Sequence, residues 1–373
     1  MSGVSRRLAA LAAAAIAVAA TVVPGASANG SKPPGPQFLG QAIVPTGTTF
    51  AGTTIGGLSS ITYDAGRGVF YSLSDDQSQF NPARFYTLHI DLSNGNLADG
   101  DVRFDGVTTL LAPDGLPYAP FSLDPEGLTL TKSGELVVTS EGFSLRGIGP
   151  WVRRYSLDGT FLGDLPVPDA FQPTGPLHGV RNNLAFEAAA VAPDGRHLFV
   201  GMENALVQDG PAASLATGSP SRILRYNLAT GRLDRQYVYF TDPIVEPPVP
   251  PTQFAVNGLV ELLPFNDEFM LSMERSFSVG AAGTGNTIKL YSVALPGADD
   301  VTGFDSIAAL LGTVRPAKKT LLLDLRTLGI PLDNIEGMTI GPTLPDGRRS
   351  LVLVSDNNFA ASQFTQFLLF ALD

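Results

Sequence analysis

The sequence lacks cysteine throughout its 373 residues, so disulfide bonds and cysteine nucleophiles are excluded. Three catalytic signatures are also absent: the Gly-x-Ser-x-Gly turn, the Gly-x-x-x-x-Gly-Lys phosphate loop and the His-Glu-x-x-His motif. Of the three histidines, His89 and His197 lie in strand-like segments, and only His178, in a Gly/Pro-containing loop, remains a candidate. Acidic side chains are therefore the main candidates for chemistry.

Charged residues are scarce, at 16% of the chain, and acids outnumber bases to give a formal net charge of -11. A field of this sign repels phosphate groups, so the sequence argues against nucleic acid and anionic membranes as partners. We expect a monomer that binds a small molecule. Cations, or anions bridged by cations, fit the charge better.

Long apolar runs are absent except near the N-terminus. Arg6 and Arg7 precede an uncharged apolar segment at residues 8–23, and Ala-Ser-Ala follows at 26–28. This arrangement predicts a signal peptide at residues 1–28 and a secreted or extracytoplasmic protein without a membrane span after cleavage. The Sec route is favoured, and the arginine pair leaves the twin-arginine route as an alternative. The mature chain, residues 29–373, would form one domain with a net charge of -13.

Five segments of the mature chain repeat one pattern. Each has a polar residue, an apolar strand, a turn, a second apolar strand and an acid, with starts at residues 59, 126, 187, 257 and 336. A third strand ending in an aromatic residue follows each hairpin. This spacing suits a four-stranded antiparallel blade, so the sequence predicts an all-β fold, a single five-bladed β-propeller. Six blades are the alternative, if a long insert contains a degenerate blade.

The two ends of the chain are expected to complete one blade. The fifth unit stops after its third strand, whereas residues 37–44 resemble a fourth strand. Pairing of the N- and C-terminal strands would close the propeller and remove exposed sheet edges.

The repeated acids predict two rings on one face of the propeller. The start of the first strand and the end of the second lie at the same end of an antiparallel hairpin, so the polar positions and the acids should meet there. The inner ring contains Ser59, Glu126, Glu187, Asn257 and Glu336. The second ring contains Asp75, Glu141, Glu203, Glu274 and Asp356. The second ring could instead close each blade through hydrogen bonds to backbone N–H groups.

The inner ring offers the hard oxygen ligands that Ca²⁺ or Mg²⁺ prefers. We predict a Ca²⁺ site made by Glu126, Glu187, Asn257 and Glu336, with Mg²⁺ as the alternative ion. Crowded carboxylates also raise one another's pKa, which makes Glu126, Glu187 and Glu336 candidate catalytic groups. Arginines near the starts of third strands, Arg84 and Arg222, are candidates for binding a substrate anion.

Several segments resemble the phytase-like family described as "esterase-like activity of phytase", a group of exported bacterial proteins. The resemblance is carried by Asp-Pro-Glu-Gly-Leu at 124–128, Ser-Glu-Gly at 140–142, Asp-Asn-Ile-Glu-Gly-Met at 333–338, and residues 344–349, 354–359 and 363–372. It extends over nearly the whole mature chain. It implies a propeller with recurring acids and hydrolysis of phosphoric esters.

Sequence and resemblance together predict an exported, metal-dependent hydrolase of phosphoric esters that activates water and uses no protein nucleophile. One alternative is a lactonase-like or carboxylic ester hydrolase, since the same cation could activate water toward a carbonyl group. Another is a non-enzymatic extracellular binding propeller, in which the cation is structural.

Overall fold

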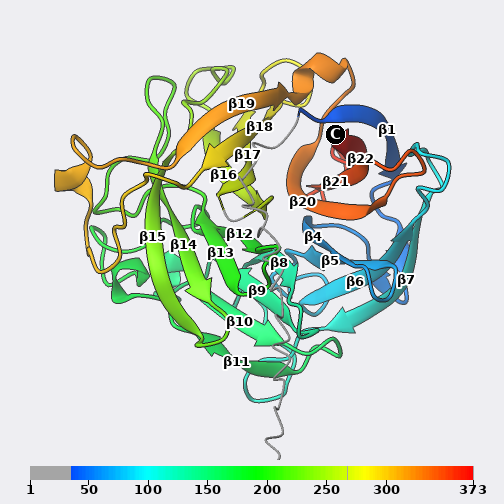
Figure 1. Ribbon diagram of the computed structural model, residues 1–373, viewed down its shortest axis with the longest axis horizontal. Coiled ribbons are helices and arrows are strands. Elements are labelled where there is room, and N and C mark those ends of the chain that lie inside the picture. Colours follow the sequence, from blue (N-terminus) through cyan, green and yellow to red (C-terminus); the bar gives the residue numbers. More distant parts are fainter. Residues whose placement is uncertain (1–34, 267, 373) are drawn as a thin grey trace, which may run out of the picture.

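The computed structural model describes residues 35–372 apart from residue 267. The strands form a ring of five four-stranded antiparallel sheets around a central axis, as Figure 1 shows. The predicted five-bladed propeller is therefore confirmed. Residues 1–34, which contain the expected signal peptide, lie outside the described residues. No helix among the described residues is long and apolar enough to cross a membrane.

In blades 1 to 4 the strands follow one another in sequence, with the first strand nearest the axis. Blade 1 contains β4 (Leu58–Asp64), β5 (Val69–Ser74), β6 (Arg84–Ile90) and β7 (Val102–Thr109). Blade 2 contains β8 (Pro125–Leu130), β9 (Leu136–Ser140), β10 (Trp151–Tyr155) and β11 (Phe161–Leu165). Blade 3 contains β12 (Phe186–Val191), β13 (His197–Met202), β14 (Pro220–Asn227) and β15 (Arg232–Phe240). Blade 4 contains β16 (Ala255–Pro264), β17 (Phe269–Ser278), β18 (Asn286–Ala294) and β19 (Lys318–Asp324).

Blade 5 joins the two ends of the described chain. Its strands are β20 (Asn334–Thr343), β21 (Arg349–Asp356), β22 (Thr365–Leu372) and, on the outside, β1 (Gln37–Val44). Strand β1 pairs with β22 from Gln37 opposite Ala371 to Val44 opposite Thr365. The predicted closure by terminal strands is thus present. The remaining short elements are the β2–β3 hairpin (Thr49–Phe50, Thr53–Thr54) and four 3₁₀ turns, η1 (Ser144–Arg146), η2 (Asp169–Phe171), η3 (Ala308–Leu310) and η4 (Leu325–Leu328).

Among the described residues, five apolar clusters each lie between two neighbouring blades, and a smaller sixth cluster packs Val301 and Ile307 against Val238 of β15. Between blades 2 and 3, for example, Val137 and Val152 pack against Phe186 and Val200. Strand β22, the third strand of blade 5, is buried along its whole length, and its sequence is accordingly apolar almost without alternation. Burial between blades is the main stabilising contribution, at roughly 25 cal/mol per Å² of apolar surface.

A β-bulge in the first strand of four blades sets the direction of the side chains at the axis. The register skips Ser59 in blade 1, Glu126 and Gly127 in blade 2, Glu187 in blade 3 and Glu336 in blade 5. A bulge leaves one residue out of the ladder and redirects its side chain. The inner-ring positions of these four blades are therefore the bulged residues.

Blade 4 differs, because its bulge lies at Val260, three residues after Asn257. The residue after the bulge, Glu261, then occupies the place held by Ser60, Ala188 or Gly337 in other blades. A side chain at Gly337 would place its Cβ 2.9 Å from the Cα of Ser60, so space there is limited. The Glu261 carboxyl accepts a hydrogen bond from its neighbour Leu262 N (2.9 Å) and lies 3.4 Å from Ser60 Oγ in blade 1. Burial raises the pKa of Glu261 well above its usual value.

Candidate acidic site

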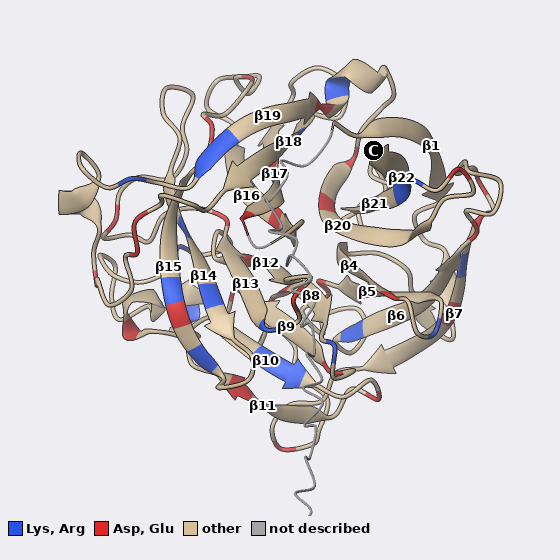
Figure 2. Ribbon diagram, in the orientation of Figure 1, with Lys and Arg blue, Asp and Glu red and all other residues tan. Residues whose placement is uncertain are grey.

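A cavity of about 680 Å³ opens where the first strands begin, on the face predicted to hold the acids. Eight carboxylate side chains and one basic side chain, Arg275, line it among the described residues. The acids are Asp75, Asp124, Glu126, Glu187, Glu203, Asp333, Glu336 and Asp356. Figure 2 shows that lysine and arginine lie mainly on outer strands such as β10, β14, β15 and β19. The cavity is therefore strongly acidic.

Three of the four predicted inner-ring ligands are brought together. Glu126, Glu187 and Glu336 all line the cavity, each from a bulge. Ser59 does not line it, and its hydroxyl donates to Glu126 O at 2.9 Å. The bulge thus converts a repeated sequence position into a group of inward-facing acids.

Asn257, the fourth predicted ligand, lies away from the cavity. Its amide Nδ2 donates to Asp242 O (2.8 Å) and to Glu274 Oε2 (3.0 Å). The shifted bulge of blade 4 accounts for this, because Asn257 is paired regularly in the ladder, opposite Ser276. In place of Asn257, blade 4 contributes Arg275, whose Nη2 lies 2.8 Å from Glu336 Oε1 and 3.8 Å from Glu203 Oε1.

The second ring is divided in a similar way. Asp75, Glu203 and Asp356 line the cavity, and Glu141 is buried close to its acids. Glu274 does not line it, since its carboxylate pairs with Lys319 and accepts a hydrogen bond from Tyr239 Oη at 2.7 Å. The ring predicted from sequence is therefore an arc over four blades.

Arg84 and Arg222 lie outside the cavity and are buried in salt bridges. Arg84 Nη1 donates to Asp76 Oδ2 at 2.7 Å, and Arg222 donates to both carboxylate oxygens of Asp209 at 2.7 and 2.8 Å. Both arginines also bind backbone carbonyl groups, Arg84 at Thr54 O and Arg222 at Phe304 O. Their donors are used to fix loops, so the structure does not place them near a substrate anion. His178 also lies outside the cavity lining, paired with Asp305 at 2.9 Å.

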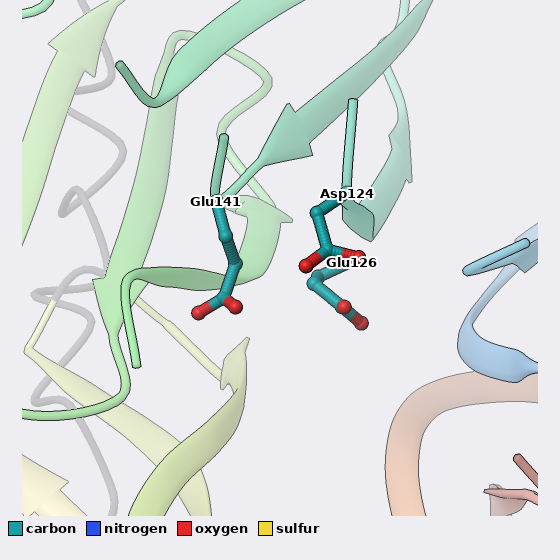
Figure 3. A group of neighbouring side chains, drawn as sticks. All are labelled: Asp124, Glu126 and Glu141. Atoms are coloured by element: carbon teal, nitrogen blue, oxygen red, sulfur yellow. The ribbon is translucent and has the colours of Figure 1, made fainter. Parts of the chain in front are cut away.

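Asp124, Glu126 and Glu141 form the group shown in Figure 3, in which the three carboxyl groups gather at one place. One ligand atom from each lies within 4.8 Å of the others. The backbone fixes this arrangement, because Glu141 N donates to Asp124 O (2.9 Å) and Asp124 N donates to Ser140 Oγ (3.0 Å). Sequence reasoning did not select Asp124. A signal existed, since Asp124 and Asn334 both stand two residues before an inner-ring glutamate.

Glu141, Glu187 and Glu203 form a second group of the same kind, with ligand atoms again within 4.8 Å of one another. Glu141 belongs to both groups. Within the described residues, three buried carboxylate oxygens around the cavity have no hydrogen-bond partner: Asp75 Oδ1, Glu141 Oε2 and Glu203 Oε1. A buried charged oxygen without a partner is costly, so each needs a proton or a cation.

Burial and mutual repulsion raise the pKa of these acids. Burial raises the pKa of Asp124 and of Glu203 to about 7, and that of Asp356 to about 8. Burial and then the neighbouring carboxylates raise the pKa of Glu126, Glu141 and Glu187 well above the usual range. Arg275 opposes this effect at Glu336 and Glu203 without reversing it. Bound cations would favour the ionised forms.

Comparison with known proteins gives one curated relative and several solved structures. An uncharacterized secreted protein of Arthroderma benhamiae is 27% identical over 183 residues, which cover 41% of this chain and 34% of that protein. The chain thus spans about a third of that relative's length.

Solved structures similar to this chain include an endo-arabinase from Bacteroides thetaiotaomicron, with a TM-score of 0.45, 12% identity and coverage of 88% of this chain and 96% of that one. A periplasmic gluconolactonase of Pseudomonas aeruginosa has a TM-score of 0.34 and 13% identity, with coverage of 84% and 85%. The sequence model of a family matches residues 53–359, most of the chain. The chain belongs to the phytase-like family, described as "esterase-like activity of phytase".

Proposed function

We propose that the protein is an exported hydrolase of phosphoric esters that depends on a divalent cation. The observation that carries this proposal is the group of Asp124, Glu126 and Glu141, three buried carboxylates with an unpartnered oxygen. They lie at a cavity whose lining, among the described residues, includes one basic side chain, Arg275. An anionic phosphoester would be repelled from such a cavity unless cations were bound there. Membership of the phytase-like family supports the same reaction class.

Asp124, Glu126 and Glu141 would hold the cation in this proposal, with Ca²⁺ preferred and Mg²⁺ as the alternative. Carboxylate oxygens are the ligands that these hard ions take. The set replaces the one expected from sequence, because the Asn257 amide is used within blade 4. When bound, the cation would neutralise a phosphate group and lower the pKa of a bound water.

The chain's own residues would orient the substrate and accept a proton. Arg275 is the basic side chain in the cavity lining and would contact the anionic group opposite the cation. Glu336 is held by two donors, Arg275 Nη2 (2.8 Å) and Asn334 Nδ2 (2.9 Å), so its carboxylate has a fixed direction. We assign Glu336 as the proton acceptor for the attacking water, with Glu187 beside it in the cavity.

Calcium titration by calorimetry into chelator-treated protein, with assays on a phosphomonoester, a phosphodiester and a lactone, tests the proposal. We expect Ca²⁺ binding, Ca²⁺-dependent hydrolysis of a phosphoester, and loss of both in Asp124→Asn. Glu274→Gln is the control, because Glu274 is a buried acid of β17 in blade 4 that lies outside the cavity lining.

Three outcomes would contradict the proposal. Hydrolysis of the lactone alone would favour the carboxylic ester reading. Calcium binding without turnover of any substrate would favour a binding propeller. An Asp124→Asn variant that binds Ca²⁺ like the wild type would remove the assigned site.

A further inference from the structure

Glu141 belongs to two groups of buried acids, so its carboxylate is placed to interact with ligands of both groups. Its carboxylate lies within 4.8 Å of ligand atoms of Asp124 and Glu126 in one group, and of Glu187 and Glu203 in the other. A carboxylate has two oxygens with lone pairs in different directions, so one side chain can bind two cations at once. The two groups would then form one continuous site.

The second group has unsatisfied oxygens of its own. Glu203 Oε1 and Glu141 Oε2 have no hydrogen-bond partner among the described residues, and these side chains belong to residues only 1% and 2% exposed. Buried polar atoms without partners are rare in folded proteins, and an unplaced ion is one recognised reason for them. This observation is independent of the spacing of the acids.

Arg275 compensates the second group only in part. Its Nη2 makes a hydrogen bond of 2.8 Å with Glu336 Oε1, whereas Glu203 Oε1 is 3.8 Å away, beyond hydrogen-bonding distance. Among the described residues, Glu187 and Glu141 form no salt bridge with a basic side chain. The arginine is therefore bound mainly to Glu336 and reaches Glu203 only as a longer ion pair, and it leaves Glu141 and Glu187 without a salt bridge to a basic side chain.

We propose that the cavity binds two divalent cations, with the carboxylate of Glu141 bridging them. Asp124 and Glu126 ligate one cation, and Glu187 and Glu203 ligate the other. The inference rests on the proposed function for the first cation and adds the second. Two adjacent cations and Arg275 leave the cavity far less negative, so that an anionic substrate can enter.

The stoichiometry of Ca²⁺ binding, measured by calorimetry on chelator-treated protein, tests the proposal. The wild type should bind two equivalents in the cavity. Asp124→Asn and Glu203→Gln should each remove one equivalent, and Glu141→Gln should weaken both by at least about tenfold, a typical loss when a supporting group is removed. The control Glu274→Gln should retain two, and thermal melting in chelator verifies that each variant is folded.

A measurement on the wild type alone tests the proposal even if the variants fail to fold. Terbium can replace Ca²⁺ at carboxylate sites, and its luminescence is quenched by neodymium in an adjacent site. Quenching that requires both ions and disappears in excess Ca²⁺ supports the paired site. Terbium emission unaffected by neodymium overturns it.

The two proposals fail in different ways. One equivalent of Ca²⁺ with phosphoester hydrolysis overturns the second site and leaves the proposed function standing. Two equivalents without hydrolysis support the paired site and overturn the proposed function. A Glu203→Gln variant that still binds two equivalents also overturns the paired site, and no binding at all overturns both.

Discussion

Glu141 in blade 2 and Glu274 in blade 4 were predicted from sequence to occupy the same ring, and both are almost completely buried, yet their surroundings differ. Glu274 meets Lys319, Tyr239 Oη and Asp242 N, all of which stabilise a negative charge. Glu141 accepts a hydrogen bond from Ala185 N and otherwise faces other acids. The comparison teaches that a repeated acid is structural where the chain supplies a cation, and available for a ligand where it does not.

Removing Lys319, the cationic partner of Glu274, should have the largest effect on stability. Lys319→Met leaves Glu274 buried without its cationic partner, and we expect the free energy of unfolding to fall by about 3–5 kcal/mol. Urea denaturation measures the change. Lys318→Met, at an exposed neighbour, is the control and should differ little from the wild type. Adding Glu274→Gln to Lys319→Met should restore part of the lost free energy of unfolding. A double variant no more stable than Lys319→Met alone would contradict the explanation.

Glu336→Gln tests the acids around the cavity through their effect on catalytic activity. Loss of the proton acceptor should lower kcat by roughly 10²–10³-fold while Ca²⁺ binding is retained, because Glu336 belongs to neither ligand group. Initial rates and calorimetry on the same preparation check this. If Ca²⁺ binding is lost in parallel with kcat, Glu336 is a ligand and its assignment as the acceptor is wrong.

The pH dependence of stability should distinguish the two regions. Burial raises the pKa of Asp124 and Glu203 to about 7 and that of Asp356 to about 8, whereas unfolded carboxyl groups titrate near pH 4. The folded state then binds protons more tightly, so its stability is highest at low pH, falls as the pH rises from about 4 toward 7 to 8, and levels off above that range. In chelator we expect a decrease on the order of 2–4 kcal/mol between about pH 5.5 and pH 8.5.

Calcium should reverse most of that decrease, since the cations would replace the protons. Urea denaturation at both pH values, with and without Ca²⁺, measures the effect. An identical decrease in Ca²⁺ would mean that the raised pKa values have no link to a cation site.

The smallest expected effect is a change in stability that has opposite signs for Glu141→Gln and Glu274→Gln. In chelator at about pH 8, Glu141→Gln should stabilise the protein by about 1–2 kcal/mol, because glutamine needs neither the bound proton nor the buried charge that Glu141 requires in the folded state. Glu274→Gln should destabilise it by a similar amount, since it leaves Lys319 with one fewer acid. Thermal melting of both variants in one buffer gives the comparison. Changes of the same sign would show that the two environments are energetically alike.

The repeat was enough to predict the fold, because five hairpins of similar composition can be buried on both faces only by packing against one another. The closing strand was also readable, since residues 37–44 match the strand missing from the last unit. The position of a bulge was not readable, because it depends on how closely the first strands approach at the axis. Asn257 was therefore placed in the cavity by analogy, whereas the structure places Arg275 there.

The arginines show a second limit of sequence reasoning. Arg84 and Arg222 begin third strands as candidates for anion binding should, but Asp76 and Asp209 reach them from neighbouring loops. Loop acids have no periodicity that would reveal their partners. Asp124 was missed for a related reason, since it precedes its strand and belongs to no repeated position in all five units.

The pairing of β1 with β22 has a consequence for how the chain folds. It joins residues more than 320 positions apart, from Gln37 opposite Ala371 to Val44 opposite Thr365, whereas the other blades form from nearby strands. Closing so long a loop is entropically unfavourable until the other blades have brought the ends together. We therefore expect blade 5 to form last, so that refolding of the whole ring waits on a single strand.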